Sequence, residues 1–194
     1  MTRVLPAGDR ASLIELPDNE AATQLARGLL ASGAYVDVVV GHCTVLVRWD
    51  GDEPELDLEA AFSALAPDAK EVELRVRYDG PDLSDVAALA GLSSEEVIAR
   101  HTRAAYVVGF LGFQPGFAYL LGLDELLHLP RLDEPRTHVP AGSVAVAGPY
   151  SGVYPRLSPG GWRLLGSTET VMFDAGRETP ALLAPGDRVR FVAA

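Results

Sequence analysis

The chain has 194 residues, of which 48% are hydrophobic and 22% are charged, and its formal net charge is −11. This composition is typical of a globular protein with a buried core. Binding to nucleic acid depends on neutralising phosphates with Lys and Arg, so the acidic balance argues against a nucleic-acid partner. No apolar run reaches about 18 residues, and the first residues lack the apolar stretch of a signal peptide. We therefore expect a cytoplasmic protein with no membrane partner.

The cysteine and histidine content limits the kinds of site that the chain can carry. Cys43 is the only cysteine, which rules out a disulfide within the chain and fits a reducing compartment. Structural zinc sites place several Cys or His ligands at close spacing. The four histidines are His42, His101, His128 and His138, and no two of them lie within four residues of each other. We therefore expect no metal site.

The first 79 residues show the order β-α-β-β-α-β. Alternating or β-branched apolar residues predict four strands, over 10–16, 36–40, 43–49 and 72–78. Apolar residues at helical spacing predict one helix between Asp18, a good N-cap, and Gly33, and a second helix over 56–65. This order is that of a ferredoxin-like α/β sandwich.

A change in sequence texture marks the second half of the chain. The segment 79–82 is rich in turn-forming residues, so we place a domain boundary there and predict domains over 1–80 and 81–194. Residues 109–167 contain 10 Gly and 7 Pro, a density that long helices cannot accommodate. Short apolar pieces between these turns predict a mostly β, barrel-like second domain, and the whole chain is therefore expected to be α+β.

Two common catalytic signatures are absent from the sequence. A phosphate-binding loop would read G-x-x-x-x-G-K-[ST], and no such loop surrounds Lys70, the only lysine. A hydrolase nucleophile elbow would read G-x-S-x-G, and Ser143, Ser151 and Ser158 lie in other contexts. The sequence therefore assigns no catalytic residue to this chain.

Four segments of the second half combine turn-forming Gly and Pro with aromatic and polar side chains. They are GFQPGFAYL at 112–120, PRTHVPAGSV at 135–144, GVYP at 152–155 and SPGGW at 158–162. Glycine lets a backbone approach a ligand and proline fixes the direction of a turn, so such segments can present N–H groups to an anion. Within 129–168, four arginines are accompanied by just two acidic residues, which favours an anion site there.

These four segments, in this order, resemble the signature of the KipI family, whose members are also labelled allophanate hydrolase subunit 1 and the B subunit of 5-oxoprolinase. The resemblance is close over residues 106–168 and looser over most of the chain. It implies a small N-terminal α/β domain followed by a cyclophilin-like β-barrel of the carboxyltransferase type. The chain departs from the family pattern at Tyr150-Ser151, where Gln-Thr is usual, and at Ser167, where Arg is usual.

The resemblance also implies a function. It points to the B subunit of an ATP-dependent 5-oxoprolinase, a lactam hydrolase that converts the small molecule 5-oxo-L-proline to L-glutamate. A KipA-like C subunit and a LamB/YcsF-like A subunit would be its partners, the complex would use ATP, and this chain would be inactive alone. Two alternatives within the family are a KipI-type inhibitor of a sensor histidine kinase and a component of urea or allophanate metabolism.

Eight residues of the four segments are candidates for substrate binding: Phe113, Pro115, Tyr119, Arg136, His138, Gly142, Ser143 and Tyr154. Arg136 and His138 can hold a carboxylate or phosphate, although Arg136 can equally pair with Glu134 or a loop carbonyl. The aromatic residues can line a pocket or belong to the barrel core, and the Ser143 hydroxyl can bind an anion or stabilise a turn. The segment Gly160-Gly161-Trp162 is a candidate partner contact, the alternative being a tight turn with a packed indole.

Overall fold

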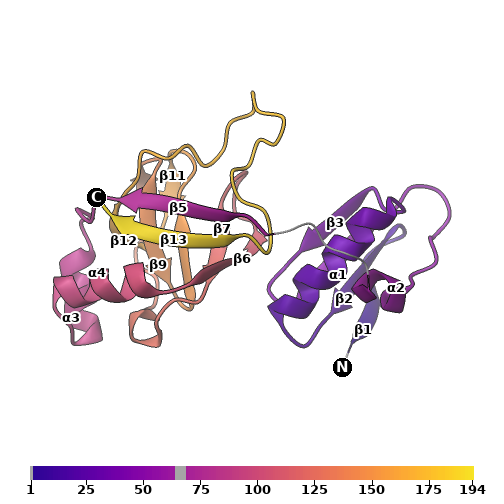
Figure 1. Ribbon diagram of the computed structural model, residues 1–194, viewed down its shortest axis with the longest axis horizontal. Helices are drawn as coiled ribbons and strands as arrows, with labels where there is room; N and C mark the ends of the chain where they lie inside the picture. Colours follow the sequence, from indigo (N-terminus) through magenta and orange to yellow (C-terminus); the bar gives the residue numbers. More distant parts are fainter. Residues whose placement is uncertain (1, 64–68) are drawn as a thin grey trace. The chain divides into compact units, whose positions relative to one another are not determined.

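The computed structural model describes residues 2–63 and 69–194 and divides the chain into two compact units, Met1–Ala69 and Lys70–Ala194 (Figure 1). The first unit contains β1 (Arg3–Pro6), β2 (Ala11–Glu15), α1 (Asn19–Ser32), β3 (Asp37–Val40), β4 (Thr44–Arg48) and α2 (Leu58–Ser63). Its antiparallel strands lie in the order β1-β2-β4-β3, and α1 packs against β3 and β4. Every second residue of β2 and β4 is buried, as expected for strands with one covered face.

The first helix, α1, begins and ends as the sequence predicts. The Asp18 carboxylate accepts a hydrogen bond from the N–H of Ala21 at 2.8 Å, and Gly33 ends the helix in the left-handed conformation with φ 66°. The helix predicted over 56–65 is observed as α2, shorter by a few residues, and its predicted positions 64 and 65 lie outside the described residues.

The strand predicted over 72–78 does not complete the N-terminal sheet. It is observed as β5 (Glu71–Val76), which lies in the second unit and pairs in parallel with β13 (Arg188–Ala193). Alternating burial identified the strand, but alternation does not specify the partner that a strand selects. The edge of the N-terminal sheet is formed instead by β1, a strand that was not predicted from the sequence.

The second unit consists of β5, two helices, a short 3₁₀ helix and eight further strands. Its remaining elements are α3 (Leu83–Ala90), α4 (Ser94–Arg103), β6 (Tyr106–Leu111), β7 (Ala118–Leu121), η1 (Glu125–Leu127), β8 (Arg136–Val139), β9 (Ser143–Ala147), β10 (Tyr150–Val153), β11 (Ser158–Gly160), β12 (Arg163–Ser167) and β13. Seven strands form one sheet in the order β12-β9-β10-β7-β6-β13-β5, and β8 and β11 form a separate two-stranded ribbon.

The seven-stranded sheet curls into a nearly closed barrel. Its edge strands β5 and β12 lead into an antiparallel bridge between Arg77 and Ser167, with N···O distances of 2.9 and 2.8 Å. Gly166 permits this approach, because a Cβ atom there would lie 2.2 Å from the carbonyl oxygen of Arg77. The expected α+β class with a barrel-like second part is therefore confirmed.

Strand β9 separates two apolar clusters on the two faces of the sheet. All five of its residues are buried. Val144 belongs to the cluster that includes α3, α4 and Phe191, whereas the next residue, Ala145, belongs to the cluster around Phe117 and Trp162. The alternation of side chains along a strand explains this split. The second cluster is the floor on which the candidate site is built.

Candidate functional site

The four glycine- and proline-rich segments converge on the Phe117 and Trp162 cluster. Strand β8 of the second segment pairs with β11 of the fourth, with Ser158 opposite Val139. Gln114 of the first segment donates from Nε2 to the hydroxyl of Ser158 at 3.4 Å. Tyr154 of the third segment packs edge-to-face on Phe117 of the first, with ring centroids 5.3 Å apart. The structure thus brings together four segments that the sequence shows only in order.

Phe113 lies at the tip of a strained turn. It is the one non-glycine residue with positive φ (64°) in the part of the chain that the structure describes, and it is 59% exposed. The turn is held by hydrogen bonds from the N–H of Gln114 to the Gly112 carbonyl at 2.6 Å and from the N–H of Gly112 to the Phe117 carbonyl at 3.1 Å. A left-handed L-residue costs about 1–2 kcal/mol, and such strain is concentrated at functional sites. Phe113 is therefore a candidate ligand or partner contact.

Arg136 is held by a buried carboxylate. Its Nη2 donates to Asp82 Oδ1 at 2.6 Å, and Asp82 Oδ2 accepts from the N–H of Leu164 at 2.7 Å. The Asp82 side chain is 5% exposed and that of Arg136 is 29% exposed. Neither Glu134 nor a loop carbonyl, the partners expected from the sequence, holds the guanidinium. The pair joins β8 to β12 and to the start of α3, so Arg136 positions the ribbon above the barrel.

The N–H groups of Gly142 and Ser143 in the 140–143 turn are occupied. Gly142 donates to the Tyr154 carbonyl at 2.7 Å, and Ser143 donates to the Pro140 carbonyl at 3.3 Å. A Cβ atom at Gly142 would lie 2.2 Å from the Thr168 carbonyl oxygen, which explains glycine with φ 79° at this position. Gly142 and Ser143 therefore connect strands, and neither of these two N–H groups is free for an anion.

The large aromatic residues of the four segments form a buried layer. Tyr154 is 1% exposed and Trp162 is 5% exposed, and half-buried Tyr119 stacks on Phe110 at 4.3 Å. Burial raises the pKa of the Tyr154 hydroxyl, opposed by a hydrogen bond from the backbone of Trp162. Its oxygen also packs on Gly160, where a Cβ atom would approach to 2.3 Å. Tyr119 and Tyr154, which were predicted as ligand contacts, therefore belong to this aromatic layer, whereas Phe113 is exposed.

The partner contact predicted over Gly160-Gly161-Trp162 has little exposed surface in this structure. Trp162 packs edge-to-face on Phe117, with ring centroids 5.2 Å apart, and Gly161 is buried as well. The half-buried residue of the three is Gly160. The contact stays a prediction, and the packed indole that the sequence offered as the alternative is what the structure contains.

Several side chains in and beside the four segments are exposed, and we call four of them the motif surface: Phe113, His138, Arg156 and Leu157. His138 Nδ1 lies 2.9 Å from the Thr137 hydroxyl, and Arg156 Nε donates to Gln114 Oε1 at 3.1 Å. Leu157 is 60% exposed. Arg156 and Leu157 were not predicted as site residues, although Arg156 was counted in the basic stretch. The exposed Pro115 lies in the same turn as Phe113.

A second polar cluster lies inside the barrel, and no sequence signal pointed to it. His101 of α4 is fully buried, with Nδ1 2.7 Å from the Tyr78 hydroxyl and Nε2 2.8 Å from the Ser151 hydroxyl. If Ser151 donates its hydrogen to the Ala145 carbonyl at 3.3 Å, it accepts from His101 Nε2–H, and Nδ1 accepts from Tyr78. Burial lowers the pKa of His101 to about 3 and raises the pKa of Tyr78. In that arrangement Ser151 is an acceptor toward His101, and the ring does not act as its base.

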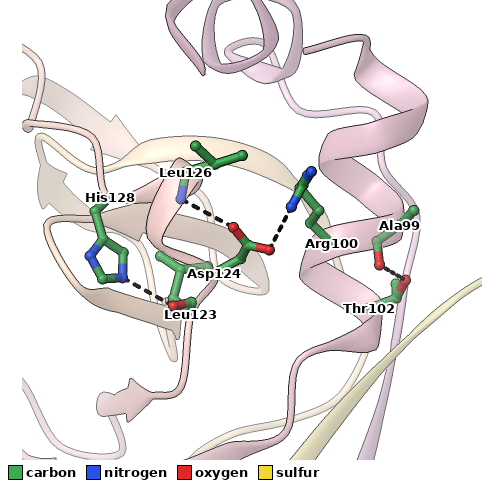
Figure 2. A network of polar contacts seen from close by, with 7 residues as sticks. All are labelled: Ala99, Arg100, Thr102, Leu123, Asp124, Leu126 and His128. Carbon is green, nitrogen blue, oxygen red and sulfur yellow. Dashed lines mark hydrogen bonds and ion pairs between the residues drawn. The ribbon is translucent and has the colours of Figure 1, made fainter. Parts of the chain in front are cut away.

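A third polar network fixes α4 against η1 (Figure 2). Arg100 Nη1 donates to Asp124 Oδ2 at 2.9 Å, and Asp124 Oδ1 caps η1 by accepting from the N–H of Leu126 at 3.1 Å. Partial burial would raise the pKa of Asp124, but these bonds and the Arg100 charge lower it. Nearby, His128 Nε2 lies 3.0 Å from the carbonyl oxygen of Leu123. The network has a structural role, since both carboxylate oxygens of Asp124 bond within the fold, one to Arg100 and one to the N–H of Leu126.

Residues 2–63 and 69–194 contain neither a metal-binding cluster nor a membrane-spanning helix. In that part of the chain, no three His, Cys, Asp or Glu side chains are grouped so that they could hold a metal ion. None of the helices described is long and apolar enough to cross a membrane.

Comparison with known families gives a consistent result. The profile of the carboxyltransferase domain, subdomains C and D, matches residues 2–183. A relative from Escherichia coli O157:H7, named as the B subunit of 5-oxoprolinase, is 54% identical over 206 residues, covering 95% of this chain and 93% of its own.

Solved structures share the fold. A crystal structure of TTHA0988 superposes with a TM-score of 0.86 at 40% identity, covering 96% of this chain. The chain spans 40% of the length of TTHA0988. The urea amidolyase of Kluyveromyces lactis superposes over 100% of this chain with a TM-score of 0.71 at 22% identity, which shows a common fold alone. From the profile match and the 54% identical relative, we conclude that the chain belongs to the carboxyltransferase-domain family, subdomains C and D, together with proteins named as the B subunit of 5-oxoprolinase.

Proposed function

We propose that this chain is the B subunit of an ATP-dependent 5-oxoprolinase complex that opens 5-oxo-L-proline to L-glutamate. The observation that carries the proposal is the 54% identity to the Escherichia coli relative of that name, over more than nine tenths of both chains. The name of one subunit implies others, and we assign a KipA-like C subunit and a LamB/YcsF-like A subunit as the partners. The reaction adds water across the lactam C–N bond, so that the ring nitrogen becomes an amine and the carbonyl carbon a carboxylate.

ATP is assigned to the complex and not to a site on this chain. The sequence contains no phosphate-binding loop, and its single lysine, Lys70, precedes β5 without one. The residues present therefore do not fit a nucleotide site of that kind. We derive no step of the ATP chemistry from this chain, and its contribution is to bind and orient.

The motif surface is the part of this chain that we assign to the shared site. Phe113 and Leu157 are apolar and more than half exposed, Arg156 bonds to Gln114 next to Phe113, and His138 lies on β8, which pairs with β11. Apolar and polar side chains together suit 5-oxo-L-proline, which has an apolar ring edge and one carboxylate, or the surface of a partner subunit that binds it. Because all four side chains are exposed, we propose that the pocket is completed by one of the partners.

A pair of matched leucines tests the assignment of the motif surface. Leu157→Ala and Leu89→Ala remove the same atoms from side chains that are 60% and 56% exposed, but Leu89 lies on α3, which is not one of the four segments. With both partner subunits present, we expect Leu157→Ala and His138→Ala to lower glutamate release at least several-fold and Leu89→Ala to leave it unchanged. Equal activity of the two leucine variants, with full activity of His138→Ala, would show that the site lies elsewhere.

The alternatives have weaker support. The likeness to urea amidolyase shows fold alone at 22% identity, so a role in urea or allophanate metabolism becomes an outcome of the assay, seen as allophanate turnover without glutamate release. Inhibition of a sensor histidine kinase is a second such outcome. Saturable inhibition of kinase autophosphorylation by this chain, in a preparation inactive on 5-oxo-L-proline, would favour it.

A further inference from the structure

One edge of β5 is unpaired for most of its length. In the parallel ladder with β13, the carbonyl oxygens of Lys70 and Val76 accept from the N–H groups of Arg188 and Ala194, so even-numbered residues of β5 face β13. Odd-numbered residues must then direct their N–H and C=O groups to the other edge. Arg77 confirms this, since both of its backbone groups bond to Ser167 on that edge.

Beyond the bridge between Arg77 and Ser167, toward Glu73, β5 separates from the opposite side of the barrel and leaves a wedge between them. A cavity of about 780 Å³ is lined by Glu73, Arg75 and Arg77 on the β5 side and by the segment 167–170 on the other side. Within the part of the chain that the structure describes, the odd-edge backbone groups of Glu73 and Arg75 have no hydrogen-bond partner. An edge of this kind is a template for another strand.

The charges of the exposed side chains of β5 reverse sign about the centre of the strand. The strand reads Glu-Val-Glu-Leu-Arg-Val-Arg over residues 71–77, with the charged residues exposed and Leu74 buried at the centre. If a second copy of this strand runs antiparallel about a two-fold axis at Leu74, Glu73 lies opposite Arg75 of the copy, and Arg75 opposite its Glu73. Shifting the register by two residues places Glu73 opposite Glu73, or Arg75 opposite Arg75, and like charges directly opposite are destabilising.

We propose that the β5 edge binds the β5 edge of a second copy of this chain, in the register centred on Leu74. Glu73 and Arg75 are both odd-numbered, so in this register each pair can exchange two N–H···O bonds, as an antiparallel ladder requires. The ladder is short because Arg77 is already paired with Ser167. The contact is isologous and closes on itself, so it yields a dimer and not a filament.

A charge exchange tests the register directly. Arg75→Glu opposes Glu73 of the copy with a second carboxylate, and Glu73→Arg opposes Arg75 with a second guanidinium. We expect the wild-type chain to sediment at twice its mass of 20.6 kDa and each single variant at 20.6 kDa. An equimolar mixture of the two single variants should recover the dimer, because each Arg then meets a Glu across the contact. The double variant Glu73→Arg/Arg75→Glu should recover it as well.

Two controls separate loss of the contact from loss of the fold. Arg188→Glu makes the same charge change as Arg75→Glu on β13, which is not the free edge, and should leave the dimer intact. Circular dichroism spectra should be the same for all variants. Glu73→Arg and Arg75→Glu are the two to check, since Glu73 pairs with Arg190 at 2.6 Å and with Arg75 of the same chain at 3.7 Å. A wild-type chain that is monomeric at every concentration would overturn the proposal. So would a dimer that Arg75→Glu leaves unchanged.

Discussion

His101 shows how a single side chain sets the chemistry of the barrel interior. Its two ring nitrogens are both bonded, one as acceptor from Tyr78 and one as donor to Ser151, and this arrangement requires the neutral ring. Protonation would place a hydrogen on Nδ1, where the Tyr78 hydroxyl already donates, and a charge in an apolar core. The cluster is therefore structural, and it makes folding sensitive to pH.

The second unit is expected to lose stability in acid because of His101. Its folded pKa of about 3 lies below the ordinary value of 6.5, so between these values the unfolded chain binds a proton that the folded chain does not. The stabilisation that results from keeping His101 neutral is therefore complete above pH 6.5. It is lost as the pH falls toward 3, at up to about 1.4 kcal/mol of unfolding free energy per pH unit. Urea unfolding followed by Trp162 fluorescence in a Trp49→Phe background measures the slope. His101→Gln should flatten it, and an equal slope in that variant would contradict the assignment.

Phe113 allows strain and function to be separated. Phe113→Gly removes the aromatic ring and also the left-handed strain at φ 64°, whereas Phe113→Ala removes the ring and keeps the strain. We expect both variants to lower the activity of the complex, with Phe113→Gly retaining the free energy of unfolding to within about 1 kcal/mol. Chemical denaturation and glutamate release, measured on the same preparations, give the comparison. Full activity of Phe113→Gly would exclude the ring from the site.

Arg136 is predicted to act through stability. Arg136→Ala leaves the carboxylate of Asp82 buried without its cation, and breaking a buried pair on one side costs about 3–5 kcal/mol, less here because Arg136 is 29% exposed. The double variant Arg136→Ala/Asp82→Asn should be less unstable than the sum of the two single variants. A double-mutant cycle of unfolding free energies gives the coupling energy between the two side chains. Strict additivity would mean that the ion pair contributes nothing to stability.

At the scale of elements, the sequence was informative wherever a local pattern decides the outcome. The cap at Asp18 and the glycine at Gly33 specify α1 because each acts within a few residues along the chain. The turn-rich segments were recognised for the same reason. The partner of β5 was not predictable in this way, since pairing with β13 joins residues 117 apart, such as Glu73 and Arg190.

The candidate site shows the same division. The four segments could be recognised from their residues, and the structure brings them together. The side chains that hold them were not recognisable, because Asp82 and Leu164 contact each other across 82 residues of sequence. Tyr154 and Trp162 were interpreted as possible contact residues, but both are buried. A sequence shows that a residue is aromatic and does not show which way its ring faces. Leu157 could not be recognised as a site residue, because a sequence does not show that a leucine is exposed and single exposed leucines are common.

The Arg100 and Asp124 network gives an element-scale prediction for the joint between α4 and η1. Asp124→Ala removes both the ion pair and the cap on η1, while Arg100→Ala removes the ion pair alone. Caps contribute about 0.5–2 kcal/mol and partly exposed pairs below about 1 kcal/mol. Asp124→Ala should therefore be the more destabilising of the two in urea unfolding. The reverse order would mean that the cap contributes nothing.

In the molecule as a whole, the features to which we assign a function lie in one of the two units. The four segments, the motif surface and the free β5 edge all lie in the second unit, Lys70–Ala194. The motif surface is built on the aromatic cluster, whereas the β5 edge borders the wedge lined by residues 73–77 and 167–170. Two separate contacts on one unit would let a homodimer form without covering the residues assigned to the shared site.

The central claim is that this chain is a required component of a 5-oxoprolinase. The measurement that tests it most directly is glutamate release from 5-oxo-L-proline and ATP, with the KipA-like and LamB/YcsF-like subunits present and this chain added or withheld. We expect release that depends on this chain and saturates as the chain is added. Equal release without the chain, or no release with all three subunits present, would contradict it.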